Sequence, residues 1–214
     1  MKIVQYIKNF LIKAFDSIKK TLFGKKIPDA DIFYLHKLDL KLLKDAVQQY
    51  ETEVKEYFDV VNKAVSQRTF DTEKVSREIN LAENVLKSLE DTRNDKSEYK
   101  KHFKSSTTLV AATSKSKAED IRHKNLSEIN DLIFKFKKIN EGWVVASCHI
   151  QTIKSNDLST ISDFKAFMNA SRKYAQVHSH IALGVISLLR KDINNLRVWE
   201  DKAEAEEYVE NDLR

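Results

Sequence analysis

Lysines crowd into the first 26 residues, where their number and spacing indicate binding to an anionic surface. This segment holds seven lysines and one acid, Asp16, so its net charge is +6, against +5 for the whole chain. The remaining residues therefore sum to −1. Apolar residues recur between the lysines at steps of three and four, which is the pattern of one helix face. They are Val4, Ile7, Leu11, Ala14, Ile18 and Leu22.

A basic helix with one apolar face is typical of helices that lie on anionic membranes. We therefore predict lipid binding through the lysines and the apolar or aromatic side chains beside them. The predicted lipid-binding residues are Lys2, Lys8, Phe10, Leu11, Lys13, Phe15, Ile18, Lys19, Lys20, Leu22 and Phe23. The same pattern also fits a helix that packs its apolar face into its own protein, docks in a partner's groove or self-associates.

Gly24 and Pro28 form the clearest boundary in the sequence. Glycine is favoured just after the last helical residue, and proline commonly follows because it cannot continue a helix. We predict a hinge at these two residues, which would let the first helix, residues 2–23, move independently of the rest of the chain.

A second basic stretch spans residues 93–117, with seven bases and two acids. We expect a basic loop or a frayed helix joint at its centre. Its candidate patch consists of Lys96, Lys100, Lys101 and Lys104. A solvated run of charge and a second lipid contact are both compatible with it. Nucleic acid is not expected as a partner, because only Tyr99 and Phe103 interleave with the bases and no recognition motif is found.

Residue types that could support catalysis or metal binding do not form a convincing set. Glu119 and His123 have helical i, i+4 spacing, but no second Glu-x-x-His motif completes a di-metal site. His178 lies on an apolar stripe and is predicted to be a buried core residue whose polar atoms are hydrogen-bonded. Cys148 is the single cysteine, expected to be a small buried residue. No phosphate-binding loop or nucleophile elbow occurs, so we predict no enzyme activity, no metal site and no cofactor.

The composition favours long helices. The chain has 214 residues with only three glycines and one proline, too few breakers for the frequent turns of a β protein. Charged residues make up 32% of the chain, above the usual ~25%. We predict an all-α fold: an elongated antiparallel bundle or coiled coil of about four helices, preceded by the amphipathic helix.

Within this bundle we predict helices over residues 31–67, from 72 onward, from about 117 to 153, and over 159–207. The first carries heptad-like apolar spacing, typical of coiled-coil packing. Part of that stripe is the predicted self-association surface: Leu40, Leu43, Val47, Tyr50, Val54 and Tyr57. The stripes leave apolar surface that one chain does not obviously cover, so we expect a homodimer or a higher oligomer.

The predicted domains are a basic amphipathic helix (1–26), a helical bundle (27–205) and an acidic tail (206–214). This layout resembles membrane-shaping helical scaffolds such as N-BAR domains and polymerising ESCRT-type remodellers, although no motif is shared residue by residue. We expect a non-enzymatic scaffold, cytoplasmic and peripheral on an anionic membrane, with no classical export signal. The alternatives are a soluble protein–protein interaction factor (an adaptor, inhibitor or immunity-type protein that does not bind lipid), or a small helical pore-forming or toxin component.

Overall fold

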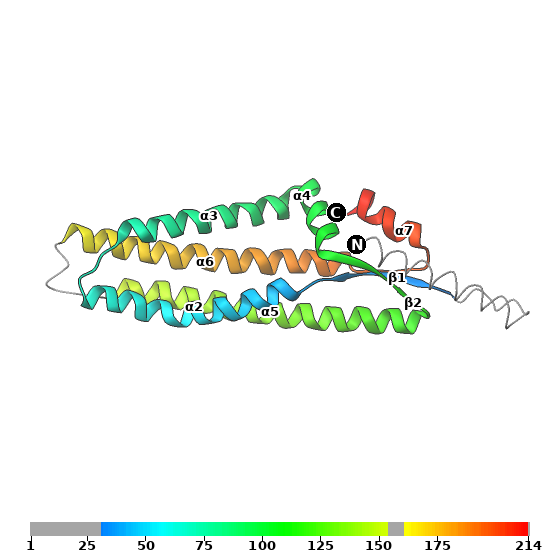
Figure 1. Ribbon diagram of the computed structural model, residues 1–214, viewed down its shortest axis with the longest axis horizontal. Helices are drawn as coiled ribbons and strands as arrows, with labels where there is room; N and C mark the ends of the chain where they lie inside the picture. The colour runs from blue at the N-terminus through cyan, green and yellow to red at the C-terminus, as the bar shows by residue number, and fades with distance from the viewer. Residues whose placement is uncertain (1–30, 154–160, 214) are drawn as a thin grey trace, which may run out of the picture.

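The computed structural model describes residues 31–153 and 161–213, and it shows an elongated, mostly helical molecule with a small sheet at one end (Figure 1). The predicted predominance of helix is confirmed. The elements are β1 (Phe33–Leu38), α2 (Lys41–Ser66), α3 (Thr72–Asn94), α4 (Lys96–Ser106), β2 (Thr107–Ala112), α5 (Lys115–Thr152), α6 (Ser162–Asn195), β3 (Val198–Trp199), α7 (Lys202–Glu207) and a π-helix (Tyr208–Asp212). The predicted lipid-binding helix and the hinge at Gly24 and Pro28 lie outside the described residues.

Four long helices form the body, with α2 packed along α5, α5 along α6, and α6 along α3. Lys44 pairs with Glu128 near the starts of α2 and α5, and Phe58 meets His149 near their ends, so these two helices run parallel. Gly142 allows their close approach, because a Cβ there would lie 2.9 Å from Cγ2 of Val54. The pair α5 and α6 is antiparallel, whereas α3 and α6 are again parallel. The expected all-antiparallel arrangement is therefore wrong for two of the three packed pairs.

The parallel pairs follow from the connections between the helices. A short turn joins α2 to α3, and Asp71 caps α3 by accepting a hydrogen bond from the Lys74 backbone nitrogen at 2.9 Å. At the other end Asp95 caps α4. The centre of residues 93–117, expected to be a loop or a frayed joint, forms α4 and β2 instead, and these two elements lead the chain to the start of α5 (Figure 1).

A three-stranded antiparallel sheet, in the order β2-β1-β3, covers the end of the body and was not predicted. Residues 33–38 were assigned to the first bundle helix from their three- and four-residue spacing, but they form β1. Both faces of this strand are buried: Phe33 and Leu35 pack with Ala112 on one face, and Leu38 joins the main core on the other. A short segment with apolar residues at both spacings is decided by its tertiary partner, here β2.

The chain also ends differently from the prediction. The last long helix, α6, stops at Asn195 rather than continuing to residue 207. The segment set apart as an acidic tail packs on the body, with Tyr208, Val209 and Leu213 buried in the main core. Within the described residues no helix has the length and apolar character needed to cross a membrane.

Candidate docking groove between α2, α3 and α6

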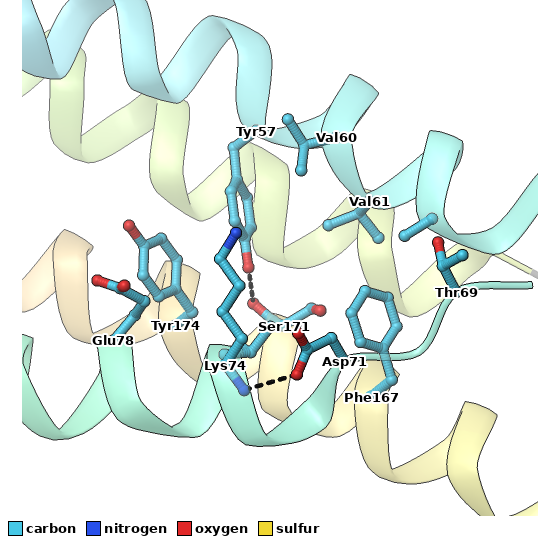
Figure 2. A pocket seen from close by; sticks show the side chains of 12 residues that line it. Tyr57, Val60, Val61, Thr69, Asp71, Lys74, Glu78, Phe167, Ser171 and Tyr174 are labelled. Carbon is cyan, nitrogen blue, oxygen red and sulfur yellow. Dashed lines mark hydrogen bonds between the residues drawn. The ribbon is translucent and has the colours of Figure 1, made fainter. Parts of the chain in front are cut away.

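The helices α2 and α3 flank α6 on one side of the body and leave a depression between them. A cavity near the α2–α3 turn is lined by all three helices (Figure 2). We call this surface, together with its continuation along α6, the groove. The cavity is lined by Val60 of the α2 wall, by Lys74 and Glu78 of the α3 wall, and by Phe167, Ser171 and Tyr174 of the α6 floor. We extend the name to residues on the same helix faces nearer the sheet: Leu42, Ala46 and Glu53 on the α2 wall, Leu81 and Val85 on the α3 wall, and His178 on the floor.

Helical spacing places each wall on one face of its helix. On α3 the wall residues follow one another at steps of four, three and four, so Leu81 and Val85 continue the row that Lys74 and Glu78 begin at the cavity. On α2 the steps from Val60 back to Leu42 are seven, seven and four, which again keep to one face. Helical spacing therefore places these residues on the same sides of α2 and α3 as the cavity, nearer the sheet end.

Both walls expose large apolar side chains. Leu42 is 81% exposed, Val60 59%, Leu81 62% and Val85 48%. Single exposed apolar residues are common, but a contiguous set of them marks an interaction surface. Among the described residues, the groove gathers four of the large exposed apolar side chains along one side of the body.

The cavity itself has a volume of about 250 Å³. Pockets for drug-sized ligands usually enclose roughly 300–1,000 Å³, so this cavity suits one or two side chains better than a small organic ligand. Its apolar wall includes Val61, Val75 and Phe167, and its polar rim includes Asp71, Lys74 and Glu78 (Figure 2).

Aromatic side chains build the floor. The Tyr57 hydroxyl donates to the backbone carbonyl of Ser171 at 3.1 Å, and the Tyr174 hydroxyl donates to the Glu53 carboxylate. The rings of Tyr57 and Tyr174 stack with their centroids 4.8 Å apart, and Tyr174 lies 4.3 Å from the His178 ring. These contacts connect α2 to α6 and hold the floor rigid.

The floor is uncharged, but carboxylates approach it from both walls. Burial raises the pKa of Tyr174, and its hydrogen bond to Glu53 adds to the rise. Burial lowers the pKa of His178, and the carboxylates of Glu53 and Glu78 oppose that shift in part. A neutral histidine thus lies between one acid from α2 and one from α3, so the electrostatic character of the groove is negative.

Two polar atoms at the floor, Ser171 Oγ and His178 Nδ1, have no hydrogen-bond partner within the described part of the chain. Nε1 of Trp143, whose ring on α5 packs against His178, is also unpaired there. Buried polar groups are nearly always paired, and an unpaired one destabilises the fold. Two of the four floor residues therefore carry a buried polar atom without a partner among the described residues.

The second basic patch lies elsewhere, on α4, where the C-terminal segment covers it. Lys100 Nζ donates to the Glu210 carbonyl at 2.6 Å, Lys104 pairs with the Glu210 carboxylate, and Lys101 pairs with Glu98 at 2.6 Å. Three of the four predicted patch lysines therefore have partners within the chain, and Lys96 is exposed.

Beneath α4 a buried polar network joins α4, α6 and the C-terminal segment; we call it the joint. Its centre is Asp192, which accepts from the Tyr99 hydroxyl at 2.9 Å and lies 3.1 Å from His102 Nε2. Asn195 donates to the Tyr99 hydroxyl at 2.7 Å and accepts from the Tyr208 hydroxyl at 2.8 Å. The joint resembles a structural clamp, since its buried polar groups bond to one another across α4, α6 and the C-terminal segment.

The predicted self-association stripe packs within the chain. Leu40 and Val47 are buried, and Leu43, Tyr50, Val54 and Tyr57 pack against the same core. Self-association through these residues would have to displace those contacts. Cys148, expected to be buried, is exposed on α5. His178 is buried as predicted, but its Nδ1 has no hydrogen-bond partner among the described residues, contrary to the prediction.

Sequence reasoning did not find the groove. The α3 stripe read from the sequence was Val75, Ile79, Ala82, Leu86 and Leu89, which packs on α6. Leu81 and Val85 fall outside that stripe and belong to no predicted contact surface. Two large apolar residues beside a complete stripe were the available signal for a second contact face.

Comparison with protein-family models, curated proteins and solved structures finds no match to this chain.

Proposed function

We propose that this protein is a non-enzymatic peripheral membrane protein that binds anionic lipid through residues 1–26 and presents the helical body at the membrane surface. The observation that carries the proposal is the separation of charge. The first 26 residues hold +6, in an amphipathic pattern, and the remaining residues sum to −1. Electrostatic attraction to an anionic leaflet is thus concentrated in one short segment.

The body supports this division of roles because its own candidate lipid contacts are engaged or repulsive. Lys100, Lys101 and Lys104 already have partners, and the groove carries carboxylates that anionic headgroups would repel. The proposal does not extend to self-association through the α2 stripe, because those six side chains pack within the chain.

The binding free energy has an electrostatic part and an apolar part. Each lysine near an anionic leaflet contributes roughly 1 kcal/mol, so seven lysines supply several kcal/mol before any apolar burial. Because salt screens such attractions over a Debye length of about 8 Å at physiological ionic strength, binding is expected to weaken as salt is raised.

Co-sedimentation of the full chain with vesicles tests the proposal. The protein should pellet with vesicles containing phosphatidylserine and should stay in the supernatant with purely zwitterionic vesicles. Leu11→Glu places a charge in the predicted apolar face, so the apparent affinity should fall by about tenfold or more.

Asn9→Glu is the matched control, because it makes the same change in charge on the opposite side of the predicted helix. It should weaken binding less than Leu11→Glu does. Equal losses in the two variants would show that the apolar face makes no lipid contact, and a full chain that never pellets would refute the proposed function.

A further inference from the structure

We propose that the groove is the resting site of residues 2–23 of the same chain, so that the groove and the membrane compete for one apolar helix face. The groove half of this inference stands on the described structure and the sequence pattern. The competition half rests on the proposed lipid binding.

The lengths agree. The predicted apolar stripe runs from Val4 to Leu22, which spans about 27 Å in a helix at 1.5 Å per residue. The exposed apolar residues of the α2 wall run from Leu42 to Val60, which is the same number of residues and the same length. A helix of residues 2–23 would cover the groove from the cavity to the end nearest the sheet.

The connection permits this placement. Nine residues, 24–32, separate the predicted helix from β1, and an extended chain of that length reaches about 30 Å. The linker must run back past the six residues of β1, which at about 3.3 Å per residue extend about 20 Å. Residue 23 can therefore reach the end of the groove near Leu42, with residue 2 toward the cavity.

Charge identifies the occupant. Asp71 and Glu78 line the cavity, and Glu53 accepts a hydrogen bond at the floor, against one wall lysine, Lys74. A groove with this excess of carboxylates and exposed Leu and Val side chains suits a basic helix with an apolar face. An anionic lipid does not fit it, because the carboxylates would repel the headgroup.

The linker also fixes the direction. A helix that ends near the sheet runs antiparallel to α2. Each step forward along this helix therefore faces one step backward along α2, and the two residue numbers of every facing pair add up to the same value. Leu22 opposite Leu42 then places Val4 opposite Val60. The cavity receives side chains from the start of the helix, which agrees with its capacity for one or two of them.

Disulfide trapping in the full chain tests the inference. In a Cys148→Ser background, Val4→Cys with Val60→Cys and Leu22→Cys with Leu42→Cys are the matched pairs. Val4→Cys with Leu42→Cys is mismatched along the groove, and Lys2→Cys with Val60→Cys is mismatched around the helix. Mild oxidation should close the matched pairs within one chain, with at least about fivefold higher yield than either mismatched pair.

Each other outcome overturns the inference. Equal yields in all four pairs would mean that residues 2–23 do not dock in the groove. Matched pairs that close only between chains, giving a dimer on a non-reducing gel, would assign the groove to the segment of a second copy. If none of the four pairs closes and a soluble partner from another source binds the groove, the groove is the site of that partner and not of residues 2–23.

A second experiment separates docking from lipid binding. Leu81→Glu on the α3 wall should weaken docking by about tenfold and raise the fraction that pellets with phosphatidylserine vesicles. Leu183→Glu is the matched control, because Leu183 is 47% exposed and lies on α6 outside the groove. The disulfide yields test docking even if no variant pellets, which would refute lipid binding alone. If Leu81→Glu leaves both the matched-pair yields and pelleting unchanged, the groove does not hold the segment.

Discussion

Helix α6 passes through two regions of opposite character, the joint at Asp192 and the groove floor from Phe167 to His178. At the joint both carboxylate oxygens of Asp192 and both side-chain polar atoms of Asn195 have partners. At the groove the Ser171 hydroxyl and His178 Nδ1 lack partners among the described residues. The polar side chains of α6 are thus hydrogen-bonded at the joint, whereas two of them at the groove floor lack a partner among the described residues.

The two regions also differ in what covers them. The C-terminal segment closes the joint with Tyr208, Val209 and Leu213, and its Glu210 neutralises lysines of α4. Over the groove no described element lies between the α2 and α3 walls, and their apolar residues are exposed. We infer that the joint contributes mainly to stability, whereas the groove is the part of the body where binding can occur.

The largest effect expected from this comparison is that of Asp192→Ala. The substitution removes the acceptor of the buried Tyr99 hydroxyl and the partner of His102, so the free energy of unfolding should fall by about 3 kcal/mol. Urea denaturation measures the loss. Asp131→Ala, which removes an exposed carboxylate from the middle of α5, should change stability by less than about 0.5 kcal/mol. Equal values for the two variants would mean that the joint does not clamp the fold.

The long helices could be predicted from the sequence because their signals are local and repeated. Apolar steps of three and four over many turns defined α2, α3, α5 and α6. The sheet could not be predicted in this way. β1 owes its conformation to hydrogen bonds with β2, whose paired residues lie 69 to 79 positions later in the chain, and its six residues fit either period.

The groove could not be predicted from the sequence for a different reason. Whether Leu81 and Val85 are covered depends on how far α2 and α3 stand apart, and that follows from the packing of α2 on α5 and of α3 on α6 rather than from the sequence of either helix. The self-association stripe shows the same limit: its spacing correctly indicated a packed face, but α5 and α6 of the same chain supply the partners.

A smaller effect should appear as a pH dependence of stability, shared between the two regions. Burial lowers the pKa of His178 at the groove floor and of His36, which bonds the Ala205 carbonyl beside the joint. Below about pH 6.5 the unfolded histidines take up protons that the folded ones refuse, so stability falls as the pH falls, by up to about 1.4 kcal/mol per pH unit for each. Urea denaturation from pH 7.5 to 5.5 should show this slope.

His178→Phe should remove the share of the slope that belongs to the groove and leave that of His36. A variant with the full slope of the wild type would show that His178 is not kept neutral by the fold. Loss of the entire slope in His178→Phe would also contradict the prediction, because His36 would then contribute nothing to the pH dependence of stability.

The smallest effect expected distinguishes the two regions most directly. Ser171 is fully buried and its hydroxyl is unpartnered within the described residues, while the Tyr57 hydroxyl bonds to its backbone carbonyl and is untouched by a change of side chain. Ser171→Ala removes the desolvated hydroxyl and improves helix propensity, so it should raise the free energy of unfolding by about 0.5 kcal/mol. Asn195→Ala, which breaks hydrogen bonds at the joint, should lower it by about 2 kcal/mol. A loss above about 1 kcal/mol in Ser171→Ala would mean that the hydroxyl is bonded after all, and the contrast between a completed joint and an incomplete groove would no longer hold.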